Sequence, residues 1–339
     1  MGLPGKTPYD AKFLQFCEDM NDLGQKGIPF VFLIDYLCKS PKLWTMEEVP
    51  AGVMFNFKGF TNFPRPKKQE NFDTTFRKYP IPFEDYLHSF EIAQRNLKRG
   101  ESFLINLSAP TPVETYLSFS EILLRSNAPY RFCFQNEFVC FSPETFITIE
   151  GDNIATFPMK GTIDASLPNA AEQVLSNPKE AAEHATIVDL LRNDMSRVAQ
   201  KVWVEKYRYL DTIYTTQGSL LQVSSEIRGI LSKNHQRAFG SILAEMLPAG
   251  SVTGAPKART LEIIDEAENY NRGYYTGVMG YFDGVRFDSA VMIRFIERTP
   301  SGLVFKSGGG ITALSDVHTE YQELIDKVYL PIPASPFVS

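Results

Sequence analysis

The alternation of apolar and polar positions along the chain predicts many short strands interrupted by single helices. Residues 28–60 contain short apolar runs separated by turns, which is typical of strands. Residues 84–99 have apolar positions at helical spacing, and Gly100 is expected to end that helix. Further strands are predicted at 102–108, 154–158, 202–209, 218–227, 274–282, 288–297 and 303–307, with a hairpin at 130–150. Further helices are predicted at about 178–200, 236–247, 258–268 and 316–329.

The order of these elements indicates the class of fold. Strands come in adjacent runs punctuated by single helices, and not in strand–helix–strand repeats, so we expect a mixed, largely antiparallel α+β architecture. Residues 61–83, which contain four prolines and several lysines, predict a surface connection. We assign residues 1–83 to N-terminal strands and this connection, as part of the same domain. Residues 84–332 form the region that carries the candidate chemistry.

Composition and charge exclude some classes of partner. The 339 residues are 43% hydrophobic, which is enough for a large buried core. The 34 Lys and Arg against 40 Asp and Glu give a net charge of -6, so the overall charge favours neither nucleic acid nor an anionic membrane as a partner. An anionic ligand would therefore need a locally positive pocket. The longest apolar stretch, 28–38, is broken by Asp35 and is too short to span a bilayer.

The first residues and the cysteines indicate the compartment. Residues 1–8 contain no apolar segment, so no secretory signal is expected. The cysteines at 17, 38, 133 and 140 form no Cys-x-x-Cys pair, and the last two flank the turn of the predicted hairpin. We expect four free thiols in a reducing compartment, and hence a cytoplasmic protein.

Two predicted helices carry acids at the same spacing. Glu180 and Glu183 lie three residues apart in one helix, and Glu320 and Glu323 repeat this spacing in the last helix. Both pairs lie in line with apolar residues, and buried carboxylates need a cation or a proton. Four such side chains offer the oxygen ligands that Mg²⁺ prefers. The alternative is two solvated helix faces, with Glu323 and Lys327 as an ordinary i,i+4 pair, and spacing alone favours it.

Glycines and one lysine can contribute to an anion site. Gly308–Gly310 follow a predicted strand and would let a ligand approach the backbone, although a tight turn is favoured for an isolated triplet. Residues 248–257 present Ser251 and Thr253 before a helix but lack the nucleotide P-loop pattern. Lys160 at a strand end is either exposed, which the bare pentapeptide favours, or a buried amine nucleophile.

Several of these segments, taken in their order, resemble one enzyme family. The segments are Ser142-Pro143-Glu144, Pro158-Met159-Lys160-Gly161-Thr162, Glu183 to Asp194, Pro248 to Lys257, Arg272 to Gly277, Gly308 to Ile311, and Ser315-Asp316 with Glu320-Tyr321. This order resembles the chorismate-binding enzymes, which include anthranilate, aminodeoxychorismate, isochorismate and salicylate synthases. The resemblance covers about residues 84–332, and so many ordered motifs make chance agreement implausible. It implies a single α+β domain of two packed, mostly antiparallel sheets flanked by helices, as in anthranilate synthase component I.

Lys160 separates the members of this family. The anthranilate, isochorismate and salicylate synthases usually carry Ala at the matching position, whereas component I of the aminodeoxychorismate synthases carries Lys. The resemblance therefore implies Mg²⁺-dependent amination of chorismate at C4 to 4-amino-4-deoxychorismate, on the route to p-aminobenzoate and folate.

The resemblance also implies roles for individual residues. Glu183 and Glu323 match the family's Mg²⁺ ligands, and Glu180 and Glu320 support them. Arg294 and Tyr275 match the residues that hold the side-chain carboxylate of chorismate. The remaining implied substrate contacts are the amides of Gly308, Gly309 and Gly310, the ammonium of Lys327, the side chains of Thr162 and Gln222, and a hydroxyl from either Ser251 or Thr253.

The implied reaction gives Lys160 and Glu144 the catalytic roles. Lys160 adds at C2 of chorismate while Glu144 protonates the hydroxyl that leaves C4, and ammonia then attacks C4 and expels the lysine. A free lysine has a pKa of about 10.4, so we expect Mg²⁺ and Arg294 to lower the pKa of Lys160. Glu144 needs a raised pKa in a shielded site.

Two positions depart from the family pattern. Gln222 stands where the family usually has His, which shifts the role of the acid toward Glu144. Leu104 stands where ammonia-using members have Gln and the isochorismate and salicylate synthases have Lys. The missing Lys argues against attack by water, and the missing Gln leaves the placement of ammonia open.

Three other functions are compatible with parts of the sequence. Lys160 argues against anthranilate synthase component I, and the retained glutamates argue against a non-catalytic chorismate-binding subunit. A fused synthase–lyase would need a further domain, for which the chain up to Ser339 has no room.

No Cys lies in a Gly-x-Cys-x-Gly turn, which a glutaminase would need, so we expect the chain to use free ammonia or ammonia from a separate glutamine amidotransferase. No Leu-Leu-Glu-Ser motif is present, so feedback inhibition by tryptophan is not expected.

Overall fold

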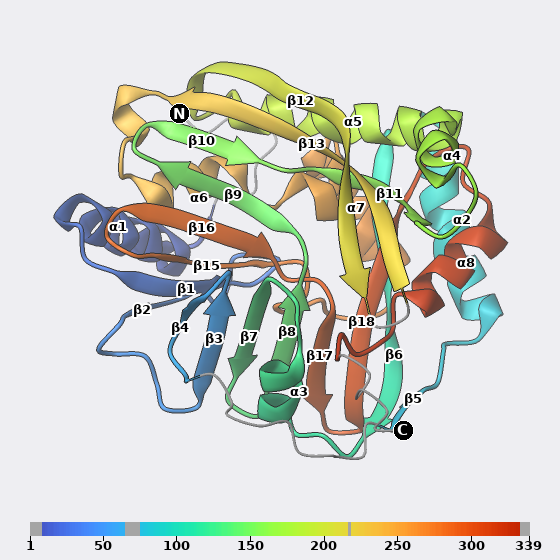
Figure 1. Ribbon diagram of the computed structural model, residues 1–339, viewed down its shortest axis with the longest axis horizontal. Coiled ribbons are helices and arrows are strands. Elements are labelled where there is room, and N and C mark those ends of the chain that lie inside the picture. The colour runs from blue at the N-terminus through green and yellow to red at the C-terminus, as the bar shows by residue number, and fades with distance from the viewer. Residues whose placement is uncertain (1–8, 65–74, 216–217, 333–339) are drawn as a thin grey trace.

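A computed structural model of the chain describes residues 9–64, 75–215 and 218–332 (Figure 1). Residues 1–8, part of the predicted connection at 61–83, and the last residues up to Ser339 lie outside these ranges, and so do the expectations that rest on them. The α-helices within the described ranges are α1 Ala11–Lys26, α2 Phe83–Lys98, α3 Phe119–Arg125, α4 Ala170–Ser176, α5 Pro178–Met195, α6 Phe239–Met246, α7 Lys257–Ala267 and α8 Val317–Asp326.

The strands form two sheets in which every described pairing is antiparallel. The first sheet has the order β11-β13-β10-β9-β16-β15-β1-β2, with β12 paired to β13. Its strands are β1 Phe30–Ile34, β2 Lys42–Thr45, β9 Thr145–Glu150, β10 Asn153–Thr156, β11 Met159–Asp164, β12 Ala199–Thr215, β13 Gly218–Leu231, β15 Val278–Phe282 and β16 Arg286–Val291.

The second sheet has the order β14-β6-β18-β17-β8-β7-β3-β4, with β5 paired to β6. Its strands are β3 Val53–Phe57, β4 Phe60–Thr61, β5 Phe76–Lys78, β6 Leu104–Thr115, β7 Tyr130–Phe134, β8 Phe138–Ser142, β14 Gly254–Ala255, β17 Phe295–Thr299 and β18 Gly302–Ile311. The predicted hairpin is β7–β8, and the four cysteines are buried free thiols, as predicted.

Strand β1 shows how the two sheets pack together. Phe30 and Phe32 point into a core shared with α1, α5 and α6, while Val31 and Leu33 point into a core shared with β3, β7 and β8. A strand buried on both faces needs an unbroken apolar run, which this segment has. Helices α2, α7 and α8 cover β6 and β18 around Ile105, on the right of Figure 1. The described chain is therefore one α+β domain of two packed antiparallel sheets flanked by helices, as predicted.

Helix α5, which carries Glu180 and Glu183, begins where the sequence predicts. The side chain of Asn177 caps it by accepting hydrogen bonds from the amides of Lys179 and Glu180, and Pro178 occupies its first turn. The predicted end at about residue 200 is wrong, because the helix ends at Met195 and the chain enters β12 at Ala199. Of the five residues between Met195 and the predicted end, Ala199 and Gln200 belong to β12, which pairs with β13 instead.

Some elements were not predicted at all. Helices α1, α3 and α4 are absent from the sequence prediction. In α1 the signals are present: Asp10 caps the helix, Phe13 and Met20 lie on its buried face, and Gly27 ends it with a φ of 69°. Within the described residues, no helix is both long enough and apolar enough to cross a membrane.

Two predicted segments have a different structure from the one expected. The single strand predicted at 288–297 is wrong, because the chain leaves the first sheet after Val291 and enters the second at Phe295. The glycines of Gly308–Gly310, expected in a loop or turn, lie inside β18 and pair with Ser108, Leu107 and Asn106 of β6. Both segments contribute to the candidate site.

Candidate active site

Lys160 lies on a β-bulge at the edge of the first sheet. In the β11–β13 ladder, Met159 pairs with Ser224 and Thr162 pairs with Gln222, so two residues of β11 oppose one residue of β13. The following Gly161 has a φ of 90°, a conformation that favours glycine. A bulge redirects a side chain out of the regular alternation of a strand. The side chain of Lys160 therefore leaves the regular alternation of β11 and points toward α5.

The ammonium of Lys160 contacts a buried carboxylate of α5. Its Nζ lies 2.7 Å from Oε2 of Glu183, and the exposed fractions of these side chains are 22% and 6%. Burial lowers the pKa of Lys160, but Glu183, Glu323 and Glu180 favour its charged form more strongly and raise that pKa overall. The glutamates thus act against the expected lowering of this pKa, which depends on bound Mg²⁺ and stays a prediction.

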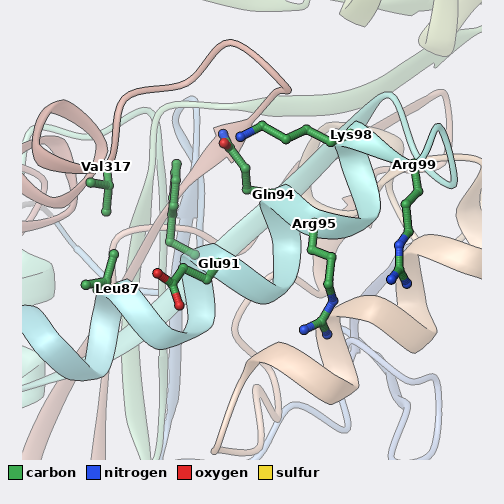
Figure 2. Close-up of a pocket in the computed structure, with 8 residues that line it drawn as sticks. Leu87, Glu91, Gln94, Arg95, Lys98, Arg99 and Val317 are labelled. Carbon is green, nitrogen blue, oxygen red and sulfur yellow. The ribbon is translucent and has the colours of Figure 1, made fainter.

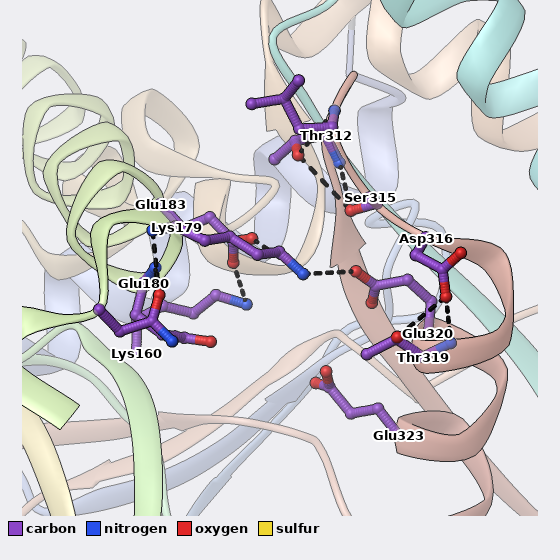
Figure 3. Close-up of polar contacts among 12 residues, drawn as sticks. Lys160, Lys179, Glu180, Glu183, Thr312, Ser315, Asp316, Thr319, Glu320 and Glu323 are labelled. Carbon is purple, nitrogen blue, oxygen red and sulfur yellow. Dashed lines mark hydrogen bonds and ion pairs between the residues drawn. The ribbon is translucent and has the colours of Figure 1, made fainter. Parts of the chain in front are cut away.

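Helix α8 brings a second acidic pair to the same place (Figure 3). Asp316 caps this helix, which lies on β18 and directs Glu320 and Glu323 toward α5. The Nζ of Lys327 lies 2.5 Å from Oε1 of Glu323 and donates to the carbonyl of Gly308 at 2.8 Å. The predicted i,i+4 pair is therefore present, but it lies at the site and not on a solvated face.

A third lysine joins the two helices. The Nζ of Lys179 lies 3.8 Å from Oε1 of Glu183 on its own helix and 3.5 Å from Oε1 of Glu320 on α8 (Figure 3). Sequence reasoning missed Lys179, although its position four residues before Glu183 is a signal for such a pair.

The glutamates do not form a ready-made metal centre. Among the described residues, no three His, Cys, Asp or Glu side chains lie close enough together to hold a metal ion. The lysines pair with Glu183, Glu320 and Glu323 instead, while Glu180 lies beside Gly161, where an added Cβ would be 3.2 Å from its Oε2. Even so, Oε1 of Glu183 is buried without a hydrogen bond, so the donor set suits a small divalent cation.

The glycines of β18 form the floor of this charged region. A Cβ on Gly309 would lie 3.5 Å from Glu320 and 3.6 Å from both Glu323 and Lys327. A Cβ on Gly310 would lie 3.1 Å from Leu104 and 3.9 Å from the Nζ of Lys160. Strand β17 pairs with β18 only as far as Lys306, so it leaves this part of the strand uncovered. Here a glycine strand, and not a glycine loop, keeps space beside the lysines.

Glu144 and Arg294 lie where the chain crosses between the sheets. Glu144 connects β8 to β9, and Arg294, with a φ of 55°, connects β16 to β17. Two backbone hydrogen bonds join these connections. The amide of Val291 donates to the carbonyl of Glu144 at 3.2 Å, and the amide of Phe141 donates to the carbonyl of Arg294 at 3.0 Å. The two residues are therefore held side by side, although they are far apart in the sequence.

The carboxyl group of Glu144 has the surroundings of a proton donor. Ser251 donates a 2.6 Å hydrogen bond to its Oε1, while the choice between Ser251 and Thr253 as a substrate contact stays a prediction. Burial raises the pKa of Glu144, against the opposing effects of Ser251, Arg294 and Lys327. The influence of Lys327 shows that Glu144 lies within electrostatic range of the α8 residues.

The other predicted substrate contacts are less closely grouped. Tyr275 is buried near Glu144 and Arg294, and burial raises the pKa of its hydroxyl. The guanidinium of Arg294 lies over the ring of Tyr329 at 5.4 Å. Thr162 is exposed and opposite Gln222 in the ladder, and within the described ranges no hydrogen bond joins either side chain to the site.

Two buried polar groups that support the site were also missed. His184 lies next to Glu183, is fully buried, and its Nε2 is 2.6 Å from the hydroxyl of Ser225 on β13. Arg272 uses all five of its donors, which reach Glu268, Thr276 and the carbonyls of Val252 and Asn106. Both residues stand in motifs noted in the sequence, which gave neither of them a role of its own, and only the structure shows what each contacts.

Two open grooves of the described residues lie away from the candidate site. One groove of about 600 Å³ is lined by residues of α2, among them Leu87, Gln94 and Lys98, and by Val317 at the start of α8, which lies beside Leu87 (Figure 2). Another of about 640 Å³ lies beside Arg77 and Arg298. None of the predicted site residues lines either groove, so the candidate site is defined by its polar contacts.

Comparison with known proteins decides between families of this fold. The family described as chorismate binding enzyme matches residues 44–333. The chain belongs to the chorismate-binding enzyme family. A solved structure of this fold, MenF, the menaquinone-specific isochorismate synthase from Escherichia coli, superposes with a TM-score of 0.70 at 16% identity, covering 93% of this chain and 80% of that chain.

Three relatives mark out the position of the chain within the family. An uncharacterised PabA-like protein from Haemophilus influenzae is 48% identical over 94% of this chain and 96% of its own length. Anthranilate synthase component 1 from Archaeoglobus fulgidus is 35% identical over 72% of this chain and 61% of its own. Aminodeoxychorismate synthase component 1 from Bacillus subtilis is 29% identical over 86% of this chain and 62% of its own. Overall identity therefore does not choose between the two synthase activities.

Proposed function

We propose that the chain aminates chorismate at C4 to give 4-amino-4-deoxychorismate. The observation that carries the proposal is the amine of Lys160, which a β-bulge presents beside Glu183 and Gly310. A side-chain amine at this point can act as a nucleophile on a bound ring, and an alanine in its place could not.

The charges of the site suit a dianionic substrate. Lys160, Lys327 and Arg294 supply positive charges to the site, and a cation held by the glutamates that pair with the two lysines would leave these charges free for an anionic ligand. We assign Arg294, with Tyr275, to the side-chain carboxylate of chorismate, and Lys327 with the amides of β18 to the ring carboxylate. The lack of side chains at Gly309 and Gly310 keeps space for the ring.

The chemistry divides between two side chains. Lys160 first loses a proton to solvent, and its neutral nitrogen then forms a bond to C2. Both ring double bonds shift, and the C4–oxygen bond breaks as Glu144 delivers a proton, so that water leaves. Ammonia then forms a bond to C4 and gives up a proton, both double bonds return, and the C2–nitrogen bond breaks to release Lys160. The net change replaces the C4 hydroxyl by an amino group.

Mg²⁺ fits this proposal as the cofactor. Glu183 and Glu323 would hold it, with Glu180 and Glu320 in support, because a buried oxygen of Glu183 has no hydrogen bond. The bound ion would withdraw electron density from the ring through its carboxylate. We propose ammonia as the co-substrate, free or delivered by a separate glutamine amidotransferase.

Anthranilate synthesis is the second candidate, because relatives with that activity are as similar in sequence. That reaction must also eliminate pyruvate from the ring, and Lys160 argues against it. Incubation of the full chain with chorismate, Mg²⁺ and ammonium distinguishes the two. We expect a product heavier than anthranilate that keeps the enolpyruvyl group, identified by mass and ultraviolet spectrum. Release of pyruvate with anthranilate, or unchanged chorismate, would reject the proposal.

A further inference from the structure

Lys179 lies between the two glutamate-bearing helices, and the proposed reaction gives it no role. Its Nζ is 3.8 Å from Oε1 of Glu183 and 3.5 Å from Oε1 of Glu320 (Figure 3). Those two glutamate side chains are 6% and 4% exposed, whereas that of Lys179 is 40% exposed. The lysine therefore reaches inward from the surface to two buried carboxylates on different helices.

The oxygen that Lys179 approaches is the one best suited to a metal ion. Oε2 of Glu183 is taken by Lys160 at 2.7 Å, while Oε1 is buried without a hydrogen bond. At 3.8 Å the ammonium compensates the charge of this oxygen without bonding to it. A divalent cation needs oxygen ligands at about 2.0–2.6 Å, so it cannot bind Glu183 and Glu320 while an ammonium lies between them.

We propose that Lys179 is a tethered competitor of the divalent cation. The ammonium of Lys179 must leave Glu183 and Glu320 before the metal binds both helices. This inference rests on the proposed function, which requires the metal there. The side chain of Lys179 has room to turn outward, because it is 40% exposed against 22% for Lys160. Lys179 therefore sets the affinity of the site for metal, because part of the binding free energy is spent on displacing it.

The test measures metal binding directly in the full chain, without substrate. Mn²⁺ serves as the probe, and free Mn²⁺ is followed by its electron paramagnetic resonance signal at physiological salt. We expect Lys179→Gln to bind Mn²⁺ about five- to tenfold more tightly than the wild type, the range for losing a partly exposed ion pair. Lys179→Arg keeps the charge and should stay within about twofold of the wild type. Circular dichroism checks that each variant is folded.

A charge-matched control separates competition from long-range attraction. Arg192 lies on the same helix, paired with Asp189 at 3.4 Å, and Arg192→Gln removes one positive charge away from the glutamates. We expect that variant to bind Mn²⁺ as the wild type does, because charges beyond the Debye length are screened.

The possible failures are distinguishable. Equal affinity in Lys179→Gln and wild type, or equal tightening in Arg192→Gln, would overturn the competitor role and leave the proposed function standing. No Mn²⁺ binding by any variant would overturn the competitor role together with the metal-dependent part of the proposed function. The chorismate assay then tests the amination itself separately.

Discussion

At the scale of single residues, Lys160 carries more of the functional argument than any other side chain. Its amine is half-buried among three glutamates that favour its charged form. The same position is usually Ala in the sister enzymes, so shortening this side chain should remove the chemistry without disturbing the fold.

Lys160→Ala should abolish formation of 4-amino-4-deoxychorismate with added ammonium, because the nucleophile is lost. Glu183 keeps Lys179 as a partner at 3.8 Å, so the variant should remain folded. Product is measured by mass spectrometry, and the fold by circular dichroism. Lys201→Ala, an exposed lysine of β12, serves as the control and should keep the wild-type rate. A wild-type rate in Lys160→Ala would end the nucleophile hypothesis.

Glu144 predicts a dependence of stability on pH. Its pKa is raised above 4.5 in the folded protein, so the folded state binds the proton more tightly than the unfolded chain does. The stability that this provides is complete below the unfolded pKa and is lost as the pH rises through the folded pKa. Glu144→Gln cannot ionise, so its melting temperature should equal that of the wild type near about pH 4 and exceed it increasingly toward pH 7.

The control for this pH series is Glu150→Gln, because Glu150 is exposed at the end of β9. It measures how much of the pH dependence follows from the removal of any one carboxylate at the surface. A Glu144→Gln variant that is less stable than the wild type at neutral pH would show that the carboxylate is favoured in the fold, and that Glu144 is not a buried acid.

At the scale of elements, the bulge in β11 decides where Lys160 points. It depends on Gly161, whose φ of 90° is strained for any other residue. A Cβ at Gly161 would also lie 3.2 Å from Glu180 and 3.5 Å from Val174, so the glycine lets α4 and α5 approach the strand.

Gly161→Ala should lower the free energy of unfolding by about 1–3 kcal/mol and reduce product formation, because the backbone at the bulge must shift. Gly151→Ala is the matched control, since Gly151 also has a positive φ, of 62°, but no atom lies within 4 Å of an added Cβ. It should cost about 1–2 kcal/mol without affecting the rate. Urea denaturation and the chorismate assay measure both effects. Equal rates in the two variants would mean that the bulge does not position Lys160.

At the scale of the whole molecule, the buried guanidinium of Arg272 contacts several of the segments that surround the site. Arg272 joins α7 through Glu268, β6 through the carbonyl of Asn106, and the segment beside Ser251 through the carbonyl of Val252. It also lies against the ring of Tyr36 at 4.6 Å. A guanidinium with all five donors used is costly to replace.

Arg272→Met should lower the free energy of unfolding by about 3–5 kcal/mol, because Glu268 would remain buried without its partner. Adding Glu268→Gln should recover part of that loss, giving a coupling energy of at least about 1 kcal/mol in a double-mutant cycle. Arg95 and Glu266 form a surface pair at 2.7 Å, and Arg95→Met should cost less than about 1 kcal/mol. Additive losses in the cycle, measured by urea denaturation, would contradict the hub role of Arg272.

Much of the fold could be predicted because local signals agree with the final structure. The cap at Asn177 and Pro178 defines the start of α5, and the spacing of Glu180 and Glu183 places both acids on one helix. The hairpin around Cys133 and Cys140 follows from short-range pattern alone. Helix α1 was not predicted, although the sequence contains its N-cap at Asp10.

The sequence by itself determined the family, the order of the motifs and the identity of Lys160, because these depend on residues that are close together in the chain. Tertiary structure decided the rest. Gly308–Gly310 became a strand because β6 pairs with them from 200 residues away. The predicted strand is broken at Arg294 because the chain passes there from β16 of the first sheet to β17 of the second. The direction of the Lys160 side chain follows from a register shift of β11 against β13. Such pairings depend on long-range hydrogen bonds, which no local pattern of apolar and polar residues specifies.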